Sequence, residues 1–95
     1  MDVGYIWDEE KYEKVRKKHQ VWFYEAVSAL EDPKGLDMED PAEHTERWMW
    51  VGQTVTNRIL SVIYTIEDDG PILRIITAFD AEPVIIEEYN DRQGF

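Results

Sequence analysis

The sequence predicts an α+β fold in one domain spanning residues 1–95, with two N-terminal helices packed on a three- to four-stranded antiparallel sheet and a C-terminal helix. Two early segments carry apolar residues at helical spacing, later segments are rich in β-branched and aromatic residues, and the tail returns to helical spacing. Helices followed by a run of strands are typical of α+β domains. A chain of 95 residues can bury one modest core.

The N-terminal part predicts a short strand over Gly4–Trp7 and then a helix over residues 9–18. Asp8 is a suitable N-cap, and acidic residues in the first turn with basic residues in the last turn favour the helix dipole. His19 continues the apolar stripe of this helix. A second stripe predicts a helix over residues 22–31, which an Asp-Pro-Lys-Gly turn ends.

The middle of the chain predicts the sheet. Residues 36–46 are acidic and turn-rich, with room for a short edge strand, and residues 47–52 alternate like a strand that has two different faces. Residues 54–67 are enriched in β-branched side chains and predict a long strand. The Asp-Asp-Gly-Pro sequence at 68–71 predicts a hairpin turn into a strand over residues 72–79.

The tail over residues 81–92 fits either a helix or a strand. Asp80 can cap a helix, and proline is tolerated in a first helical turn. Ile85, Ile86 and Tyr89 would share one helix face, which favours the helix. We expect one core, formed by Tyr12, Val15, Phe23, Val27, Ile63, Ile75 and Ile76.

Charge limits the classes of function. The net charge is −11, and the predicted first helix holds the only cluster of cations. This balance opposes phosphate binding by the molecule as a whole. The chain has no cysteine, which excludes disulfides and thiolate metal sites, and no apolar run of membrane-spanning length. We therefore expect a cytoplasmic protein without membrane association.

Several short motifs in order resemble the BrnT family of bacterial toxins, which are small RelE-like ribonucleases of type II toxin–antitoxin systems. The resemblance covers nearly the whole chain, although no single motif is specific. The motifs are Trp7-Asp8, Lys18-His19, Phe23 with Glu25-Ala26, Asp32-Pro33, Glu46-Arg47-Trp48, Gly52, Arg74-Ile75-Ile76-Thr77-Ala78, Ala81 and Tyr89.

The resemblance implies a metal-independent messenger RNA ribonuclease that needs no cofactor, inhibits translation and is neutralised by a ribbon-helix-helix antitoxin, with a 2:2 complex as in one such toxin pair. Such cleavage needs a base, a cation for the phosphorane charge and an acid for the leaving oxygen. The implied catalytic residues are His19, Arg47 and Tyr89. The implied RNA-binding residues are Lys17, Lys18, Arg58 and Arg74.

Three features depart from the pattern of the family. Gln20 stands where a glycine usually follows the histidine, and Phe79 stands where an arginine is usual. Asp80, Glu87 and Glu88 replace a basic region. Losing one electrostatic contact to a transition state costs about 10²–10³ in rate, so we expect weak cleavage of RNA.

Other interpretations of the same residues remain open. The chain could be an inactive toxin-fold module that binds a protein, or an acidic mimic of nucleic acid. His19 also suits a helix end, and its spacing from His44 does not match a metal motif. Trp48, Trp50 and Tyr64 could stack on bases, but they also suit the core or a partner surface.

Overall fold

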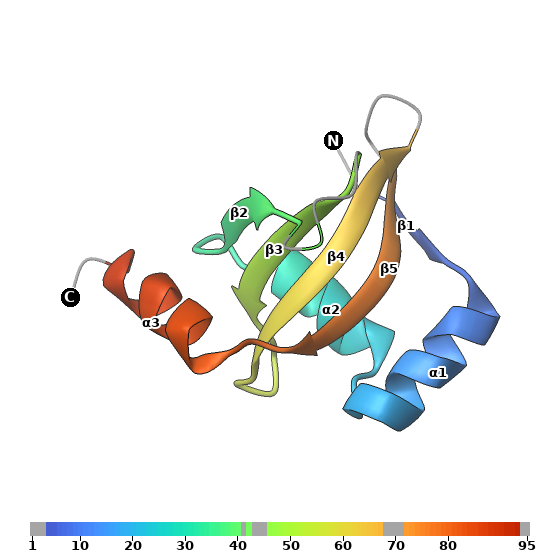
Figure 1. The fold of residues 1–95 in the computed structure, drawn as a ribbon, viewed down its shortest axis with the longest axis horizontal. Coiled ribbons are helices and arrows are strands. Elements are labelled where there is room, and N and C mark those ends of the chain that lie inside the picture. Colours follow the sequence, from blue (N-terminus) through green and yellow to red (C-terminus); the bar gives the residue numbers. More distant parts are fainter. Residues whose placement is uncertain (1–3, 41, 43–45, 68–71, 94–95) are drawn as a thin grey trace.

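The computed structural model describes residues 4–40, 42, 46–67 and 72–93, and this part of the chain forms three helices and five strands (Figure 1). The hairpin turn expected at 68–71 lies outside the described residues. The elements in chain order are β1 (Gly4–Trp7), α1 (Glu9–His19), α2 (Phe23–Leu30), β2 (Leu36–Glu39), β3 (Trp48–Gln53), β4 (Ile59–Glu67), β5 (Ile72–Asp80) and α3 (Pro83–Asp91).

The strands form one mixed sheet in the order β1-β5-β4-β3-β2. The α+β class is confirmed, but the sheet has five strands rather than three or four, and it is not wholly antiparallel. β1 runs parallel to β5, with Trp7 opposite Ile75, whereas β2 to β5 pair antiparallel. In this pairing, Tyr5 and Trp7 lie against the apolar layer beneath the two N-terminal helices.

The core consists of two clusters, one on each face of the sheet, rather than the single core expected. Neighbouring residues of a strand face opposite ways, so Val62 lies under α1 and α2 while Ile63 lies on the side of α3. Of the expected core residues, Ile63 and Ile76 belong to the second cluster. The first cluster contains or contacts Tyr12, Val15, Phe23, Val27 and Ile75.

Helix α1 begins as its sequence predicts and ends in a left-handed residue. The Asp8 carboxylate accepts hydrogen bonds from the backbone N–H groups of Glu10 and Lys11. Gln20 has a φ of 56° and donates its backbone N–H to the carbonyl of Arg16. A glycine would reach this conformation without steric penalty. The turn is therefore made with a less suitable residue than the family pattern has.

Two element boundaries differ from expectation. Residues 54–58 form a tight turn, in which Thr54 and Arg58 are joined by a backbone hydrogen bond and Asn57 has a φ of 66°, so β4 starts only at Ile59. The C-terminal segment is a helix, as its apolar face predicts. However, Pro83 is its first residue and Glu82 its N-cap, which leaves Asp80 at the end of β5.

Helix α2 lies unusually close to β3. A Cβ added to Gly52 would come within 2.1 Å of the carbonyl oxygen of Ala29, so only glycine fits beneath the helix. The Trp50 indole donates a hydrogen bond of 2.7 Å to the same carbonyl. These contacts fix α2 on the sheet and, through the short connection between the helices, limit where α1 ends.

Candidate functional site

The end of α1 brings His19 to the end of β5. α1 packs along β5, and the ring centroids of His19 and Phe79 lie 5.7 Å apart with their planes inclined by 46°. Both side chains are half-buried. The position that would carry an arginine in the family pattern therefore lies beside the histidine, and in this chain it presents an apolar ring.

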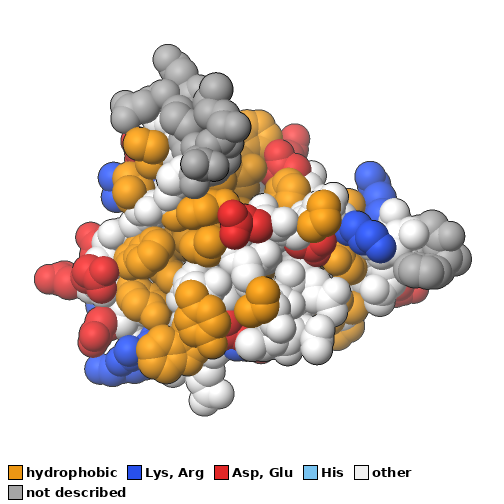
Figure 2. Space-filling model, turned by 180° about the vertical axis from the view of Figure 1, so that it is seen from behind, with side chains coloured by type: hydrophobic (Ala, Val, Ile, Leu, Met, Phe, Trp, Pro, Cys, Tyr) orange, Lys and Arg blue, Asp and Glu red, His pale blue; other side chains and the backbone are white. Residues whose placement is uncertain are grey.

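The last turn of α1 is basic, as expected. Lys17 and Lys18 are exposed there, while Arg16 lies over the Trp22 ring at 4.8 Å from its centroid. Trp22 and Tyr24 keep 46% and 58% exposure, which is high for aromatic residues, and Figure 2 shows apolar side chains gathered on this face. Lys17, Lys18 and His19 therefore share the last turn of α1, and both lysines are exposed to solvent.

Arg58 reaches the same end of the molecule from the turn before β4. Its Nη1 donates to the backbone carbonyl of Gln20 at 2.9 Å and to Glu25 Oε1 at 3.2 Å. Its Nε and Nη2 both donate to Asp80 Oδ1, at 3.1 and 2.9 Å. Gln20 and Asp80 follow His19 and Phe79 in the chain, so Arg58 joins the two segments that carry them.

Glu25 holds the Arg58 side chain from the buried side. The residue is 4% exposed, and its carboxylate accepts hydrogen bonds from the backbone N–H of Trp22 and from Thr56 Oγ1 in addition to Arg58. A buried carboxylate is tolerated because each of these donors compensates its lost hydration. We call the residues Gln20, Glu25, Thr56, Arg58 and Asp80 the Arg58 cluster.

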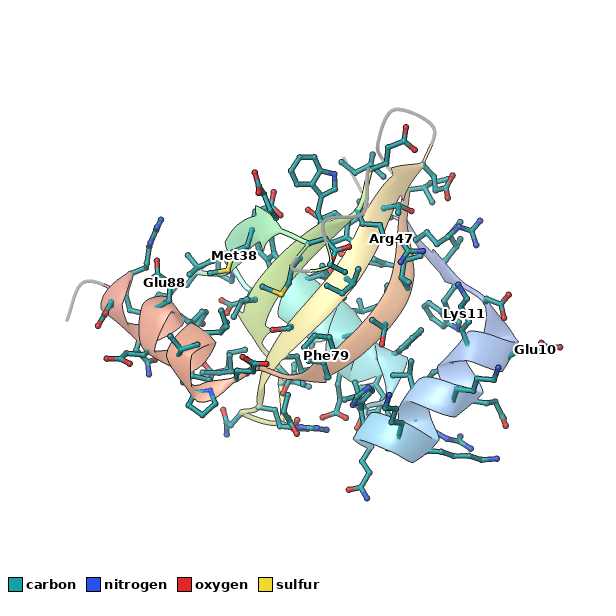
Figure 3. The ribbon with its side chains drawn as sticks, viewed as in Figure 1. Glu10, Lys11, Met38, Arg47, Phe79 and Glu88 are labelled. Carbon is teal, nitrogen blue, oxygen red and sulfur yellow. The ribbon has the colours of Figure 1, made fainter. Side chains whose placement is uncertain are left out.

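Arg47 lies nearer the start of β5 than Phe79 does, because Trp48 pairs with Tyr64 and Tyr64 with Ile75. It comes from the segment before β3 and shares with Phe79 a hollow of about 270 Å³ on the face of α3, lined also by Ile63, Ile76 and Thr77. Figure 3 places Arg47 and Phe79 toward opposite ends of β5. The structure therefore brings His19 to Phe79, whereas Arg47 lines the same hollow as Phe79 from farther along the sheet.

Tyr89 lies elsewhere. It belongs to α3, is buried in the second core cluster and donates a hydrogen bond of 2.5 Å to Asp32, on the side of the sheet far from α1 (Figure 1). Burial, and then the hydrogen bond and charge of Asp32, raise the pKa of Tyr89 to about 12. This contact accounts for Tyr89 as a structural residue, and the fold does not bring it to His19.

Arg74 is also distant from the cluster. It lies near the start of β5, and its Nε pairs with Glu67 at 2.7 Å. The guanidinium group of Arg74, like that of Arg58, is therefore paired with a carboxylate. Glu25 and Asp80 were missed as partners of Arg58, because they are 33 and 22 residues away in sequence. The one feature of the sequence that indicated a structural role for Glu25 was its position in the first turn of a predicted helix.

Two absences concern the described part of the chain. Within the described ranges no group of three or more His, Cys, Asp or Glu residues is arranged to hold a metal ion, and His44 lies outside those ranges. No helix among the described residues is long and apolar enough to cross a membrane.

Comparison with known proteins identifies the fold and the family. A search of curated protein sequences finds no match. The crystal structure of the Brucella abortus ribonuclease toxin BrnT matches the fold with a TM-score of 0.67 and 22% sequence identity, covering 84% of this chain and 97% of that one. The sequence model of the ribonuclease toxin BrnT of type II toxin–antitoxin systems matches residues 7–83. This chain therefore belongs to the BrnT toxin family.

Proposed function

We propose that the protein is the toxin of a type II toxin–antitoxin pair and cleaves messenger RNA slowly, without a metal ion. Membership of the family supports the class of activity. The observation that carries the proposed slowness is the contact of the Phe79 ring with His19, where the family pattern has a cation. The substrate would be cytoplasmic messenger RNA, and cleavage would inhibit translation.

The proposed chemistry assigns His19 as the base that takes the proton of the 2′-hydroxyl, whose oxygen then attacks the phosphorus. The bond to the 5′-oxygen breaks, and this leaving oxygen takes its proton from water, because Tyr89 lies away from His19. A phosphorane next to His19 would develop negative charge that a nearby cation should stabilise. We assign Arg47 as that cation, because it lines the same hollow as Phe79 while Arg58 is neutralised by two carboxylates. Lys17 and Lys18 would hold the RNA backbone, because they are exposed on the turn that ends in His19.

The partner we propose is a small ribbon-helix-helix antitoxin, assembled with the toxin in a 2:2 complex. With a net charge of −11, the toxin should attract a partner whose contacting surface is basic. Electrostatic attraction of this kind speeds association and falls with salt. A test is co-purification of the toxin with the product of an adjacent reading frame that encodes such a protein.

A second function is favoured by the Arg58 cluster. With Arg58 bound by Glu25 and Asp80, and Arg74 by Glu67, the toxin fold could serve only to bind its protein partner. This alternative predicts binding of the antitoxin with no cleavage of RNA. The mimic of nucleic acid is less well supported, because the carboxylates concentrate in loops and in the tail rather than on one face.

The deciding experiment is degradation of a generic messenger RNA by the isolated protein at low salt. We expect cleavage well below that of a basic member of the family, and further loss in His19→Ala. Equal rates in the two proteins would show that Phe79 and the acidic tail have no effect. Cleavage that His19→Ala leaves unchanged would refute the proposed centre and indicate a contaminating nuclease or a binding-only role.

A further inference from the structure

Arg58 presents two edges of its guanidinium group to two different carboxylates. The inner edge, Nη1, contacts Glu25 and the carbonyl of Gln20, while the outer edge, Nε with Nη2, contacts Asp80. Paired N–H donors of this kind fit the oxygens of a phosphate as well as those of a carboxylate. We propose that Arg58 forms a phosphate-binding site for RNA, and that the side chain of Asp80 occupies the phosphate position.

The inner half of the site is built rigidly. Glu25 has a side chain that is 5% exposed, and Thr56 holds its Oε2 at 2.7 Å. Because Glu25 and a backbone carbonyl fix Nη1, the guanidinium plane is held with its outer edge toward Asp80. A cation positioned in advance loses little entropy when an anion binds.

The outer half is exchangeable. The side chain of Asp80 is 68% exposed, and both donors of Arg58 converge on one of its oxygens, Oδ1. Ion pairs at the surface contribute little to stability, so an incoming anion can displace this carboxylate at small cost. Asp80 is therefore a competitor for phosphate within the chain rather than an essential part of the fold.

The location matches the proposed ribonuclease centre. Arg58 contacts Gln20, which follows His19, and Asp80, which follows Phe79. The rings of His19 and Phe79 are themselves in contact. A phosphate on the outer edge of Arg58 would lie at the end of β5, next to the basic turn that contains Lys18. The inference rests on the proposed function for its ligand, since a single-stranded RNA supplies phosphates along such a path.

The test compares two variants that change the net charge equally. Asp80→Asn weakens the competitor without changing its shape, and Glu82→Gln removes a carboxylate two residues away whose side chain makes no cap hydrogen bond. Binding of a short labelled single-stranded RNA is measured by fluorescence anisotropy at several salt concentrations. Circular dichroism checks that each variant is folded.

We expect Asp80→Asn to bind RNA about fivefold to tenfold more tightly, the size of one charge-assisted hydrogen bond at a partly exposed site. The slope of log affinity against log salt should steepen by about 0.7, which corresponds to one more phosphate contact on a single strand. Glu82→Gln should change affinity less than about twofold, because salt screens it. Adding Arg58→Gln to Asp80→Asn should remove the gain.

The outcomes separate this inference from the proposed function. Equal gains in Asp80→Asn and Glu82→Gln, or no gain in either, would overturn the phosphate site even if the wild-type protein cleaves RNA. A gain confined to Asp80→Asn that Arg58→Gln abolishes would support the site even if no cleavage is found, in which case the ribonuclease proposal alone fails. A gain that persists with Arg58→Gln would also refute the assignment.

Discussion

Replacing Phe79 with arginine should return a cation to the proposed ribonuclease centre and raise the rate of RNA cleavage. The ring of Phe79 lies 5.7 Å from that of His19, and an arginine side chain from the same Cβ is long enough to reach a phosphate held there. One electrostatic contact to a transition state changes rates by about 10²–10³. Asp80 would partly neutralise the new arginine, so we expect a gain of about 10- to 100-fold.

The substitution should leave the domain folded. Phe79 is half-buried at the margin of the second core cluster rather than inside it. Full truncation of a buried phenylalanine costs about 3–5 kcal/mol, but the aliphatic stem of arginine keeps part of the contact, so we expect a loss of about 1–2 kcal/mol. A domain of this size commonly has about 5–15 kcal/mol of stability, which exceeds that loss.

The assay compares cleavage of a generic messenger RNA with circular dichroism of the same samples. Phe79→Gln is the matched control, because it removes the ring and adds a polar chain without charge. Asp80→Lys in addition should raise the rate further by removing local repulsion of phosphate. His19→Ala should abolish the gain, since the base and the cation act on one transition state. A folded Phe79→Arg protein without added activity would refute the latent ribonuclease centre and favour a binding-only role.

Two further predictions concern buried pairs. Burial raises the pKa of Asp32, but hydrogen bonds led by that of Tyr89 outweigh it and hold the pKa of Asp32 below its ordinary value. Tyr89→Phe should therefore lower the urea midpoint, with a loss of about 1–2 kcal/mol. Stability in the wild type should fall as the pH drops through the acid range where Asp32 protonates, and also as the pH rises from about 10 to about 12, where Tyr89 ionises first in the unfolded chain. Tyr89→Phe should make the alkaline decline shallower without abolishing it, because burial also raises the pKa values of Tyr64 and Tyr5. An unchanged profile would contradict the pairing. Glu25→Gln should destabilise the fold by about 1–3 kcal/mol, because Arg58 loses its buried partner. Equal urea midpoints for Glu25→Gln and the wild type would show that the pair contributes no stability.

The parts of the fold that the sequence predicts are those set by local rules. The cap at Asp8, the apolar face of α3 and the alternation of β3 all depend on residues close in sequence, and each is confirmed. The parallel pairing of β1 with β5 depends on segments about 70 residues apart, which no local pattern specifies. The same limit explains why the sequence does not predict two core clusters. An apolar strand with both faces buried has no alternation to show that Ile63 belongs to a second cluster.

The sequence predicts the candidate site only where its residues belong to a motif of the family. His19 and position 79 meet because α1 packs along β5, a contact that the resemblance to the family implies and that periodicity alone does not. The partners of Arg58 could not be found in this way. Glu25 and Asp80 fulfil local roles in the sequence, as a first-turn acid and a strand end, and only the turn at 54–58 brings Arg58 between them.

The negative charge of the chain can oppose RNA in two ways that respond differently to salt. The net charge of −11 repels phosphate over distances that physiological salt screens within about 8 Å. The carboxylates of Asp80 and Glu67 act at contact distance instead, because they occupy the donors of Arg58 and Arg74. Salt weakens the first effect without freeing those donors for RNA, since added anions compete for them as well. Paired carboxylates should therefore restrict RNA binding more than unpaired ones at physiological ionic strength and above.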